Sequence, residues 1–220
     1  VYFSDTASDT ALVSSQPAAV TAPTEDAATV ISVFSDEYTD VAVVDFAPVW
    51  GDWQSARVTP TEDGTMLKVS NMNNLQGMQI ANPDTSEGAI DASAKTSLHM
   101  DIYVEEAGSL EFRLISPNPA GGALEASVFL DASIGWNSYN IDLDAFTGVD
   151  LSTITQFMFR NEGQTTPVTD FYLDNVYFSD TASDTALVSS QPAVGPDVPT
   201  DTASDVVSLF SDTYTAVTTA

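Results

Sequence analysis

Apolar and polar residues alternate with a period of two along much of the sequence between residues 28 and 178. In the stretch SLHMDIYV (97–104), every second residue is apolar. This period is typical of a β-strand with one face in a core, whereas a helix repeats about every 3.6 residues. We therefore predict strong strands at 97–104, 109–115, 124–131, 136–143, 154–160 and 169–178, and weaker strands at 30–34, 66–70 and 77–81.

Turn-forming residues separate these predicted strands. They include Glu62-Asp63-Gly64, Ala107-Gly108, the stretch 117–122 and Ile134-Gly135. Short strands with one apolar face each are stable when two antiparallel sheets pack face to face. About 150 residues are enough to bury roughly two-thirds of the unfolded surface without disulfides. The predicted fold class is all-β, a jelly-roll β-sandwich.

The sequence repeats itself over a distance longer than the predicted sandwich. Residues 1–18 recur unchanged as 176–193, and VISVFSDEYTDV (30–41) recurs as VVSLFSDTYTAV (206–217). The stretches between the repeats are rich in Ser, Thr, Asp, Ala and Pro, a composition typical of linkers. We predict four parts: the end of a preceding repeat with its linker (1–27), the module (28–178), a second linker (179–203) and the first strand of the next repeat (204–220).

The charge of the chain excludes several partners. It has 5 Lys and Arg against 32 Asp and Glu, a formal net charge of −27. Binding to nucleic acid or to an anionic membrane surface needs clustered cations, so neither is expected. No apolar run approaches the roughly 20 residues that span a bilayer, so we expect no membrane insertion. The sequence contains no cysteine, which excludes disulfides, thiol nucleophiles and cysteine metal sites.

Several longer strings give the sequence a family resemblance. They are FSDEYTDVAVVDFAPVWGDW, SNMNNLQGMQIAN, TSLHMDIYV, LISP, GWNSYNIDL and YLDNVYF. These strings resemble the β-sandwich modules of secreted marine bacterial laminarinase-type β-glucanases, which occur in tandem and are similar to carbohydrate-binding modules. The resemblance implies a non-catalytic module that binds a β-glucan-like polysaccharide. The chain departs from the family pattern at Leu75, where an aromatic residue is common, and at Tyr103, where Trp is common.

The resemblance also implies one structural calcium ion. Modules of this type bind it between the opening strand and the last strand, where carboxylate and carbonyl oxygens supply six to eight ligands. The matching residues here are Asp36, Glu37, Asp40 and Asp174. The repeat keeps the first as Asp212 but has Thr213 and Ala216 at the other two positions, which favours Asp36 and Asp174. The alternative is that these residues are solvated acids of an acidic protein.

Sugar binding calls for flat aromatic faces and for planar polar groups that pair with hydroxyls. The sequence offers two tryptophans in the string VWGDW, an amide-rich run next to them, and two arginines at outward strand positions. In the alternative interpretation, the first tryptophan plugs the loop, the amides form turns and the arginines pair with neighbouring acids. Trp136 is expected in the core. The candidate glycan-binding residues are Trp50, Trp53, Asn71, Asn73, Gln76, Gln79, Arg113 and Arg160.

The sequence does not favour catalysis. Glycoside hydrolysis needs two carboxylates about 5–10 Å apart, and no short strand motif marks such a pair. A Ser-His-Asp triad would have to use His99, the single histidine, in the middle of a predicted strand. We therefore expect that the module is not an enzyme.

Two functions remain at this stage. The first is a non-catalytic glycan-binding module in a long, secreted or cell-surface, tandem-repeat protein. The second is a structural repeat of an extracellular filament or adhesin stalk, in which neighbouring copies are joined through ordered linkers and strand addition.

Overall fold

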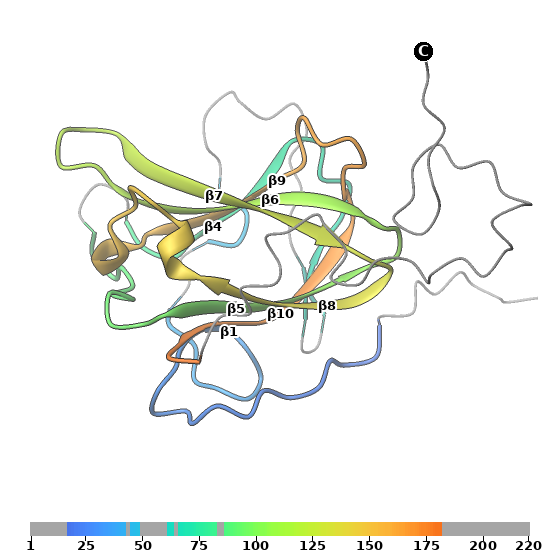
Figure 1. Cartoon of the computed structure of the whole chain (residues 1–220), viewed down its shortest axis with the longest axis horizontal. Helices are drawn as coiled ribbons and strands as arrows, with labels where there is room; N and C mark the ends of the chain where they lie inside the picture. The colour runs from blue at the N-terminus through green and yellow to red at the C-terminus, as the bar shows by residue number, and fades with distance from the viewer. Residues whose placement is uncertain (1–16, 43–44, 49–60, 64–65, 83–85, 182–220) are drawn as a thin grey trace, which may run out of the picture. The chain divides into compact units, whose positions relative to one another are not determined.

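The computed structural model of the chain describes residues 17–42, 45–48, 61–63, 66–82 and 86–181 (Figure 1). The chain divides into two units, Val1–Val188 and Ser189–Ala220, and all described residues lie in the first unit. The predicted linker from 182 onward and the predicted strand of the next repeat therefore lie outside the described residues.

The described residues form two antiparallel sheets packed face to face, which confirms the predicted β-sandwich. In the first sheet, the order is β2-β3-β10-β5-β8, and β1 also pairs with β10. The strands β1 and β3 lie along the same edge of β10, because Val176–Phe178 pairs with β1 and Phe171–Leu173 pairs with β3. The bounds are β1 (Ile31–Phe34), β2 (Thr61–Asp63), β3 (Met66–Val69), β5 (Ser97–Val104), β8 (Gly135–Asp142) and β10 (Phe171–Ser179).

The second sheet has four strands in the order β4-β9-β6-β7. Two short 3-10 helices, η2 (Leu143–Ala145) and η3 (Leu151–Thr153), connect β8 to β9. Apart from the pairs β2–β3 and β6–β7, neighbours in these sheets are distant in sequence. This crossing of the chain between two sheets is the jelly-roll arrangement. The bounds are β4 (Leu75–Gln79), β6 (Gly108–Pro117), β7 (Ala123–Ala132) and β9 (Gln156–Arg160).

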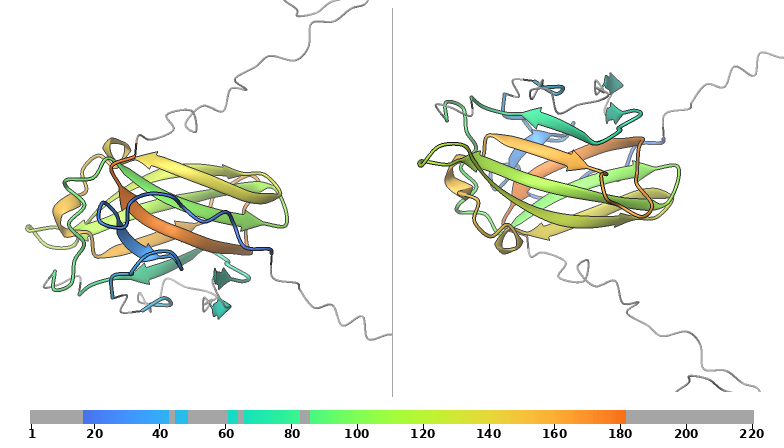
Figure 2. Two further views of the ribbon diagram at one scale, coloured as in Figure 1. Left: turned by 90° about the horizontal axis from the view of Figure 1, so that it is seen from below. Right: turned by 90° about the horizontal axis from the view of Figure 1, so that it is seen from above.

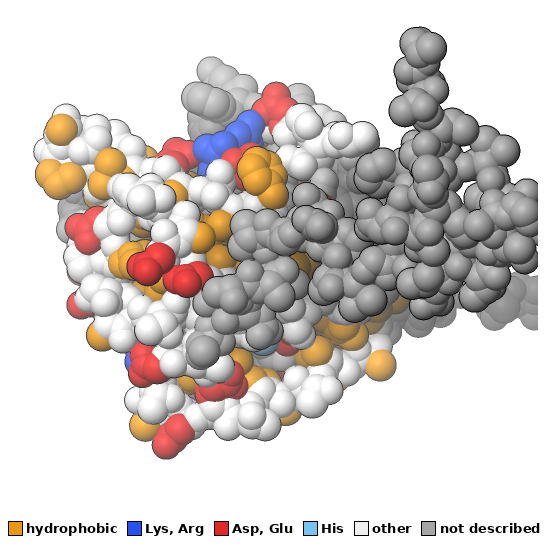
Figure 3. All heavy atoms as spheres, viewed as in Figure 1, with side chains coloured by type: hydrophobic (Ala, Val, Ile, Leu, Met, Phe, Trp, Pro, Cys, Tyr) orange, Lys and Arg blue, Asp and Glu red, His pale blue; other side chains and the backbone are white. Residues whose placement is uncertain are grey.

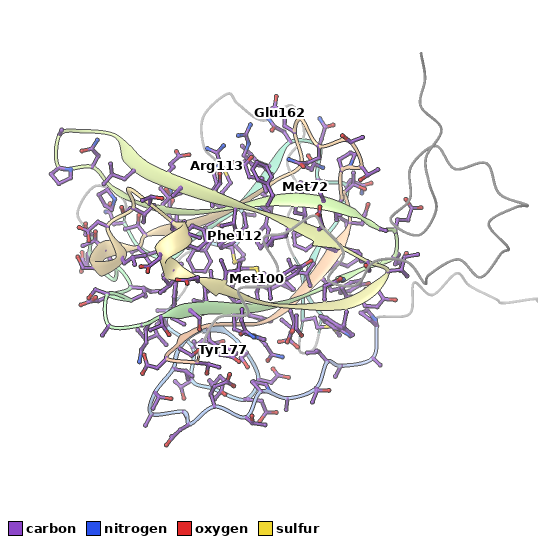
Figure 4. The ribbon with its side chains drawn as sticks, viewed as in Figure 1. Met72, Met100, Phe112, Arg113, Glu162 and Tyr177 are labelled. Atoms are coloured by element: carbon purple, nitrogen blue, oxygen red, sulfur yellow. The ribbon has the colours of Figure 1, made fainter. Side chains whose placement is uncertain are left out.

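The core lies between the two sheets and consists of the apolar residues that the alternation predicts. In β5, all four of the predicted inward residues are at most 1% exposed. Phe112 of β6 contacts Phe157 and Phe159 of β9, with ring centroids 5.6 and 5.1 Å apart, in tilted and edge-on arrangements that aromatic pairs prefer. Figure 4 shows Phe112 and Met100 pointing into the space between the sheets.

The strand β2 differs from the prediction. The string Glu62-Asp63-Gly64 was expected to be a turn, but Glu62 and Asp63 belong to β2 and pair with Leu67 and Met66 of β3. Only residues 64 and 65 separate the two strands, so the turn lies later than the sequence indicates. A short polar edge strand shows no period of two, which is why the pattern missed it.

Candidate functional site

The outward face of the four-stranded sheet carries a groove of about 320 Å³. The register of the strands brings its residues together, since Arg160 of β9 lies between Leu75 of β4 and Glu111 of β6. One register step along, Met158 lies beside Arg113. Figure 4 shows Arg113 and Glu162 on this outward side, away from the core. The residues that line the groove are Asn74, Leu75, Arg113, Ile115, Glu125, Gln156, Met158, Arg160 and Glu162.

A continuous row of alternating charges crosses this face. Arg160 Nη2 lies 2.5 Å from Glu162 Oε2, and its Nη1 lies 3.5 Å from Glu111 Oε2. Arg113 continues the row, with Nη2 2.6 Å from Glu111 Oε1 and Nη1 2.7 Å from Glu125 Oε2. In Figure 3, blue basic side chains gather beside red acidic ones at the upper edge of the molecule.

Hydrogen bonds and ion pairs hold both arginines in the row. Burial alone would lower the pKa of Arg113, but hydrogen bonds to Glu125 and Glu111 raise it above the usual value. The central carboxylate, Glu111, is only 6% exposed and contacts both arginines. Planar guanidinium and carboxylate groups are therefore presented in fixed orientations along the groove.

Two polar atoms at the groove have no partner. Arg160 Nε and Asn74 Oδ1 are the buried side-chain atoms without a hydrogen bond among the described residues. Both residues line the groove. Leaving a buried donor or acceptor unpaired costs about 1–3 kcal/mol, so such atoms are rare and call for an explanation. One is a donor and the other an acceptor, which is the pairing that a hydroxyl group offers.

An exposed aromatic ring lies on the same outward face. Phe129 of β7 is 62% exposed and is paired in register with Glu111. Alternation along β7 therefore places its side chain on the side of the arginines. The face combines this ring, the row of charges and the apolar side chains of Leu75, Ile115 and Met158.

The structure separates the predicted sugar-binding residues. Arg113 and Arg160 line the groove, and Gln79, at the end of β4, lies in the same register row as Gln156. Gln76 faces the interior instead, where its Nε2 donates to the backbone carbonyl oxygen of Phe46 at 2.9 Å. It is 5% exposed and does not line the groove, so its role in glycan binding stays a prediction.

The remaining predicted residues lie elsewhere. Asn71 and Asn73 are exposed in the loop between β3 and β4, and Asn71 borders a different cavity. Trp50 and Trp53 lie outside the described residues, so their role stays a prediction. Sequence reasoning also missed Met158 and Gln156, although both alternate with the buried Phe157 and Phe159 in β9.

A larger cavity, of about 740 Å³, lies at one end of the six-stranded sheet and is bordered by Tyr103, Tyr172 and Lys68. Its rings contact other side chains. Lys68 Nζ lies 5.2 Å from the ring centroid of Tyr172, and Tyr103 packs edge-on against Tyr172 and Trp136. This cavity therefore offers a sugar fewer free aromatic faces than its size indicates.

His99 forms a polar network that differs from a catalytic triad. Its Nε2 lies 3.4 Å from Asp101 Oδ2, and Asp101 accepts a hydrogen bond from Ser138 Oγ. The carboxylate thus lies between the histidine and the serine, whereas a triad needs the histidine in the middle. Burial alone would lower the pKa of His99, but hydrogen bonds with Asp101 and Asn140 raise it.

The predicted calcium ligands lie near one another at the β1 end of β10. Asp40 Oδ1 accepts hydrogen bonds from Ser32 Oγ at 2.5 Å and from the backbone N–H of Ser35 at 3.1 Å. Asp174 is 5% exposed and accepts a hydrogen bond from the backbone N–H of Asn175 at 2.7 Å. Asp36 and Glu37 are exposed.

Burial raises the pKa of Asp174 to about 6, and the negative charges of Asp36, Asp101 and Asp40 add to the rise. Within the described part of the chain, no three acidic, histidine or cysteine side chains converge to hold a metal ion. An ion at Asp174 would therefore need backbone carbonyl oxygens among its ligands.

No helix within the described residues has the length and apolar character to cross a bilayer.

Comparison with known proteins finds similarity among solved structures. No protein-family model matches the sequence, and no curated protein matches it. One similar structure is the family 11 carbohydrate-binding module from Clostridium thermocellum in complex with a beta-1,3-1,4-mixed-linked tetrasaccharide, at 16% identity and a TM-score of 0.46, covering 64% of this chain and 96% of that module. Another is a mutant of CBM29-2, from the family 29 carbohydrate binding modules, complexed with mannohexaose, at 15% identity and a TM-score of 0.46, covering 69% of this chain and 92% of that one.

Proposed function

We propose that the module binds a β-glucan-like polysaccharide at the groove of the four-stranded sheet, without catalysis. The observation that carries this proposal is the pair of unpartnered buried atoms, Arg160 Nε and Asn74 Oδ1, at one groove. A sugar hydroxyl both donates and accepts, so it offers the kind of partner that each of the two atoms lacks among the described residues. This gain exists only in the complex, which makes it a driving force for binding.

The other features of the face fit the same ligand class. The exposed ring of Phe129 offers a flat apolar surface to a pyranose ring. Leu75, which is half-buried, offers apolar contact to sugar C–H groups within the groove, and the largely buried Met158 lines it beside Arg113. The arginines are neutralised by Glu111, Glu125 and Glu162, so the face suits a neutral glycan better than an anionic one.

Affinity electrophoresis tests this proposal. The chain is run in native gels with laminarin or with soluble mixed-linkage β-glucan, and retardation is expected. Arg160→Lys keeps the charge but removes Nε as a guanidinium donor, and Phe129→Ala removes the ring, so each is expected to weaken retardation at least fivefold. Lys68→Arg, on the other sheet, is the matched control and is expected to bind normally. Equal mobility of all chains with and without glucan would contradict the proposal.

We propose extracellular or cell-surface location for this function, in a tandem-repeat protein. The exact recurrence of residues 1–18 at 176–193 supports the tandem arrangement. Individual modules can then bind weakly, because linked copies raise the overall avidity. Secretion is tested by fractionating the source cells with an antibody to the module, and a signal confined to the cytosol would contradict it.

A second candidate function is a structural repeat of an extracellular filament or adhesin stalk. One observation favours it: Ala18 and Glu25, both in the predicted linker, accept hydrogen bonds from the module. Electron microscopy separates the two candidates. Regular fibres of chains with several repeats support the structural role, and isolated beads on flexible strings support the glycan-binding module.

We also propose a structural calcium ion beside Asp174. The burial of this carboxylate and the nearby charges of Asp36 and Asp40 support it, since a divalent cation would relieve their repulsion. Thermal unfolding with calcium and with chelator is the test. A calcium-dependent rise of the melting temperature is expected, and its absence would contradict the site.

A further inference from the structure

The segment before β1 lies across the outward face of the six-stranded sheet. Figure 2 shows residues from 17 onward, in dark blue, crossing β10 before the chain turns into β1. This segment (residues 17–28, here called the strap) forms no strand. All of it except residue 28 belongs to the stretch (1–27) that the sequence predicts as the end of a preceding repeat and its linker.

Hydrogen bonds hold the strap near both of its ends. At one end, Trp136 Nε1 donates to the backbone carbonyl oxygen of Ala18 at 2.8 Å. At the other end, the hydroxyl of Tyr38 donates to the carbonyl oxygen of Glu25 at 3.0 Å, and Thr181 Oγ1 donates to Glu25 Oε1 at 3.3 Å. Tyr177 also hydrogen-bonds with Glu25. Pro17 and Pro23 restrict the backbone, which lowers the entropy lost on docking.

Between these ends, the strap covers polar and aromatic side chains of the sheet. A cavity of about 570 Å³ lies between residues 19–25 and the side chains of His99, Asp101, Trp136, Ser138 and Tyr177. The imidazole of His99 stacks on Tyr177, with ring centroids 4.7 Å apart. The surface below the strap is therefore suited to a chain with small side chains, such as Ala19-Val20-Thr21-Ala22.

The strap changes where the chain enters the module. The first strand begins at Ile31, which pairs with Phe178 near the end of β10. Lys95 Nζ contacts both segments, at 2.7 Å from the carbonyl oxygen of Thr29 and 3.3 Å from Asp180 Oδ2. The start of β1 and the end of β10 are thus neighbours, so a module without the strap would have its two ends side by side.

The far end of the strap lies at the opposite end of the sheet. Trp136 pairs in register with Tyr103, which pairs with Tyr172 at the beginning of β10. From Tyr172 to Ser179 the strand rises by about 23 Å, at about 3.3 Å per residue. The docked strap therefore moves the point at which the chain reaches the module by most of the length of β10.

We propose that the outward face of β8, β5 and β10 is a docking surface for the linker that precedes each repeat, so that the chain enters and leaves a module at opposite ends. The repeat supports this, because Pro23-Thr24-Glu25 recurs as Pro199-Thr200-Asp201 and Tyr38 recurs as Tyr214. The linker of the next repeat thus keeps an acid at the position of Glu25 and the tyrosine that binds its backbone. Successive modules would then follow one another head to tail.

Distance measurement between spin labels tests the proposal in the full chain. The sequence has no cysteine, so Ala18→Cys and Asp144→Cys introduce the only two labelling sites. Ala18 lies at the far end of the strap, and Asp144 is an exposed residue of η2, just after β8 at the end where the chain leaves. Double electron–electron resonance is expected to give one narrow distance peak.

Substitutions and a mixing experiment decide among the outcomes. Trp136→Phe combined with Glu25→Ala is expected to remove at least half of the narrow peak, whereas Glu162→Gln, just after β9 of the other sheet, leaves it unchanged. A broad distribution in the unsubstituted chain, or a peak that the double substitution leaves intact, would overturn the proposal. Singly labelled Ala18→Cys and Asp144→Cys chains are also mixed. The narrow peak in that mixture would mean docking onto a second copy, which also overturns docking within one chain.

Discussion

The two outward faces of the sandwich both carry charged and polar side chains, but they differ in whether these side chains have partners and in whether the strap covers them. On the six-stranded sheet, His99, Asp101, Ser138 and Asn175 form a network in which each named group has a partner, and the strap covers it. On the four-stranded sheet, no part of the strap covers the charge row, and Arg160 Nε and Asn74 Oδ1 have no partner within the described part of the chain. The named polar groups of the first face satisfy one another, whereas two buried polar atoms of the second face have no hydrogen bond among the described residues.

This difference indicates how the module divides stability and binding. A satisfied buried network stabilises one fold and leaves little for a ligand to gain. A face with unpaired atoms is less stable alone and gains free energy when a ligand pairs them. Substitutions on the covered face should therefore change mainly stability, and substitutions on the open face should change mainly binding.

Asp101→Ala gives the largest expected effect. Asp101 is 2% exposed, and its loss leaves His99, Ser138 and Asn175 Nδ2 without their shared acceptor. Breaking a buried charge network in this way costs about 3–5 kcal/mol of unfolding free energy. Urea unfolding followed by intrinsic fluorescence measures it. Asp144→Ala, at an exposed position, is the control and should change the free energy of unfolding by less than about 0.5 kcal/mol. If Asp101→Ala lowered the free energy of unfolding by as little as this, the proposed role of the network would be contradicted.

Asp174→Asn should remove a pH dependence of stability. The folded-state pKa of Asp174 is about 6, against 3.8 for the free group. Between these values the folded protein binds more protons than the unfolded one, so stability falls as pH rises through this range and stays low above it. The free energy of unfolding falls by up to about 3 kcal/mol, because each unit of difference between the folded and unfolded pKa is worth about 1.4 kcal/mol.

Unfolding in chelator at pH 4 and pH 7.5 checks this prediction. At pH 7.5, the Asn variant should be the more stable chain, because it buries no charge beside Asp36 and Asp40. With calcium the order should reverse if the proposed ion binds, since the amide is a weaker ligand than a carboxylate. A variant with the same pH profile as the unsubstituted chain would contradict the raised pKa.

Much of the fold could be predicted from the sequence, because a single buried face imposes alternation on each strand. The predicted bounds of β5, 97–104, are those of the structure. The strand β2 was missed, because an edge strand of three polar residues buries too little to produce a pattern. Trp136 was expected in the core, but it alternates with the buried Tyr139 and Ile141 and lies on the outward face, under the strap.

The groove could be predicted only in part. Alternation in SLEFRLI places Arg113 outward, and the structure confirms that position. The neighbours of Arg113 and Arg160 depend on which strands pair and in what register, which local periodicity does not contain. Gln76 shows the limit most clearly: in LQGMQ no alternation distinguishes the two faces, and only the pairing of Leu75 with Arg160 shows that Gln76 points inward.

Asn74→Ala tests the open face with a smaller effect on stability. The substitution removes a buried acceptor that has no partner, so the free protein should become about 1 kcal/mol more stable. Retardation by β-glucan should weaken at the same time, because a sugar hydroxyl bound in the groove loses Asn74 Oδ1 as a partner. Urea unfolding and affinity electrophoresis of the same preparation measure both. A chain that loses stability but keeps its binding would show that Asn74 is structural.

Glu162→Gln gives the smallest expected effect and isolates the role of charge at the groove. Glu162 is 60% exposed at its side chain and pairs with Arg160 Nη2 at the end of the row. Exposed ion pairs contribute about 0–1 kcal/mol, so the unfolding free energy should change by less than about 0.5 kcal/mol. The amide can still accept from Arg160, and Nε stays without a partner in the free protein. If unpaired atoms rather than net charge drive recognition of a neutral glycan, binding should change less than twofold; a larger loss would assign recognition to the charge row instead.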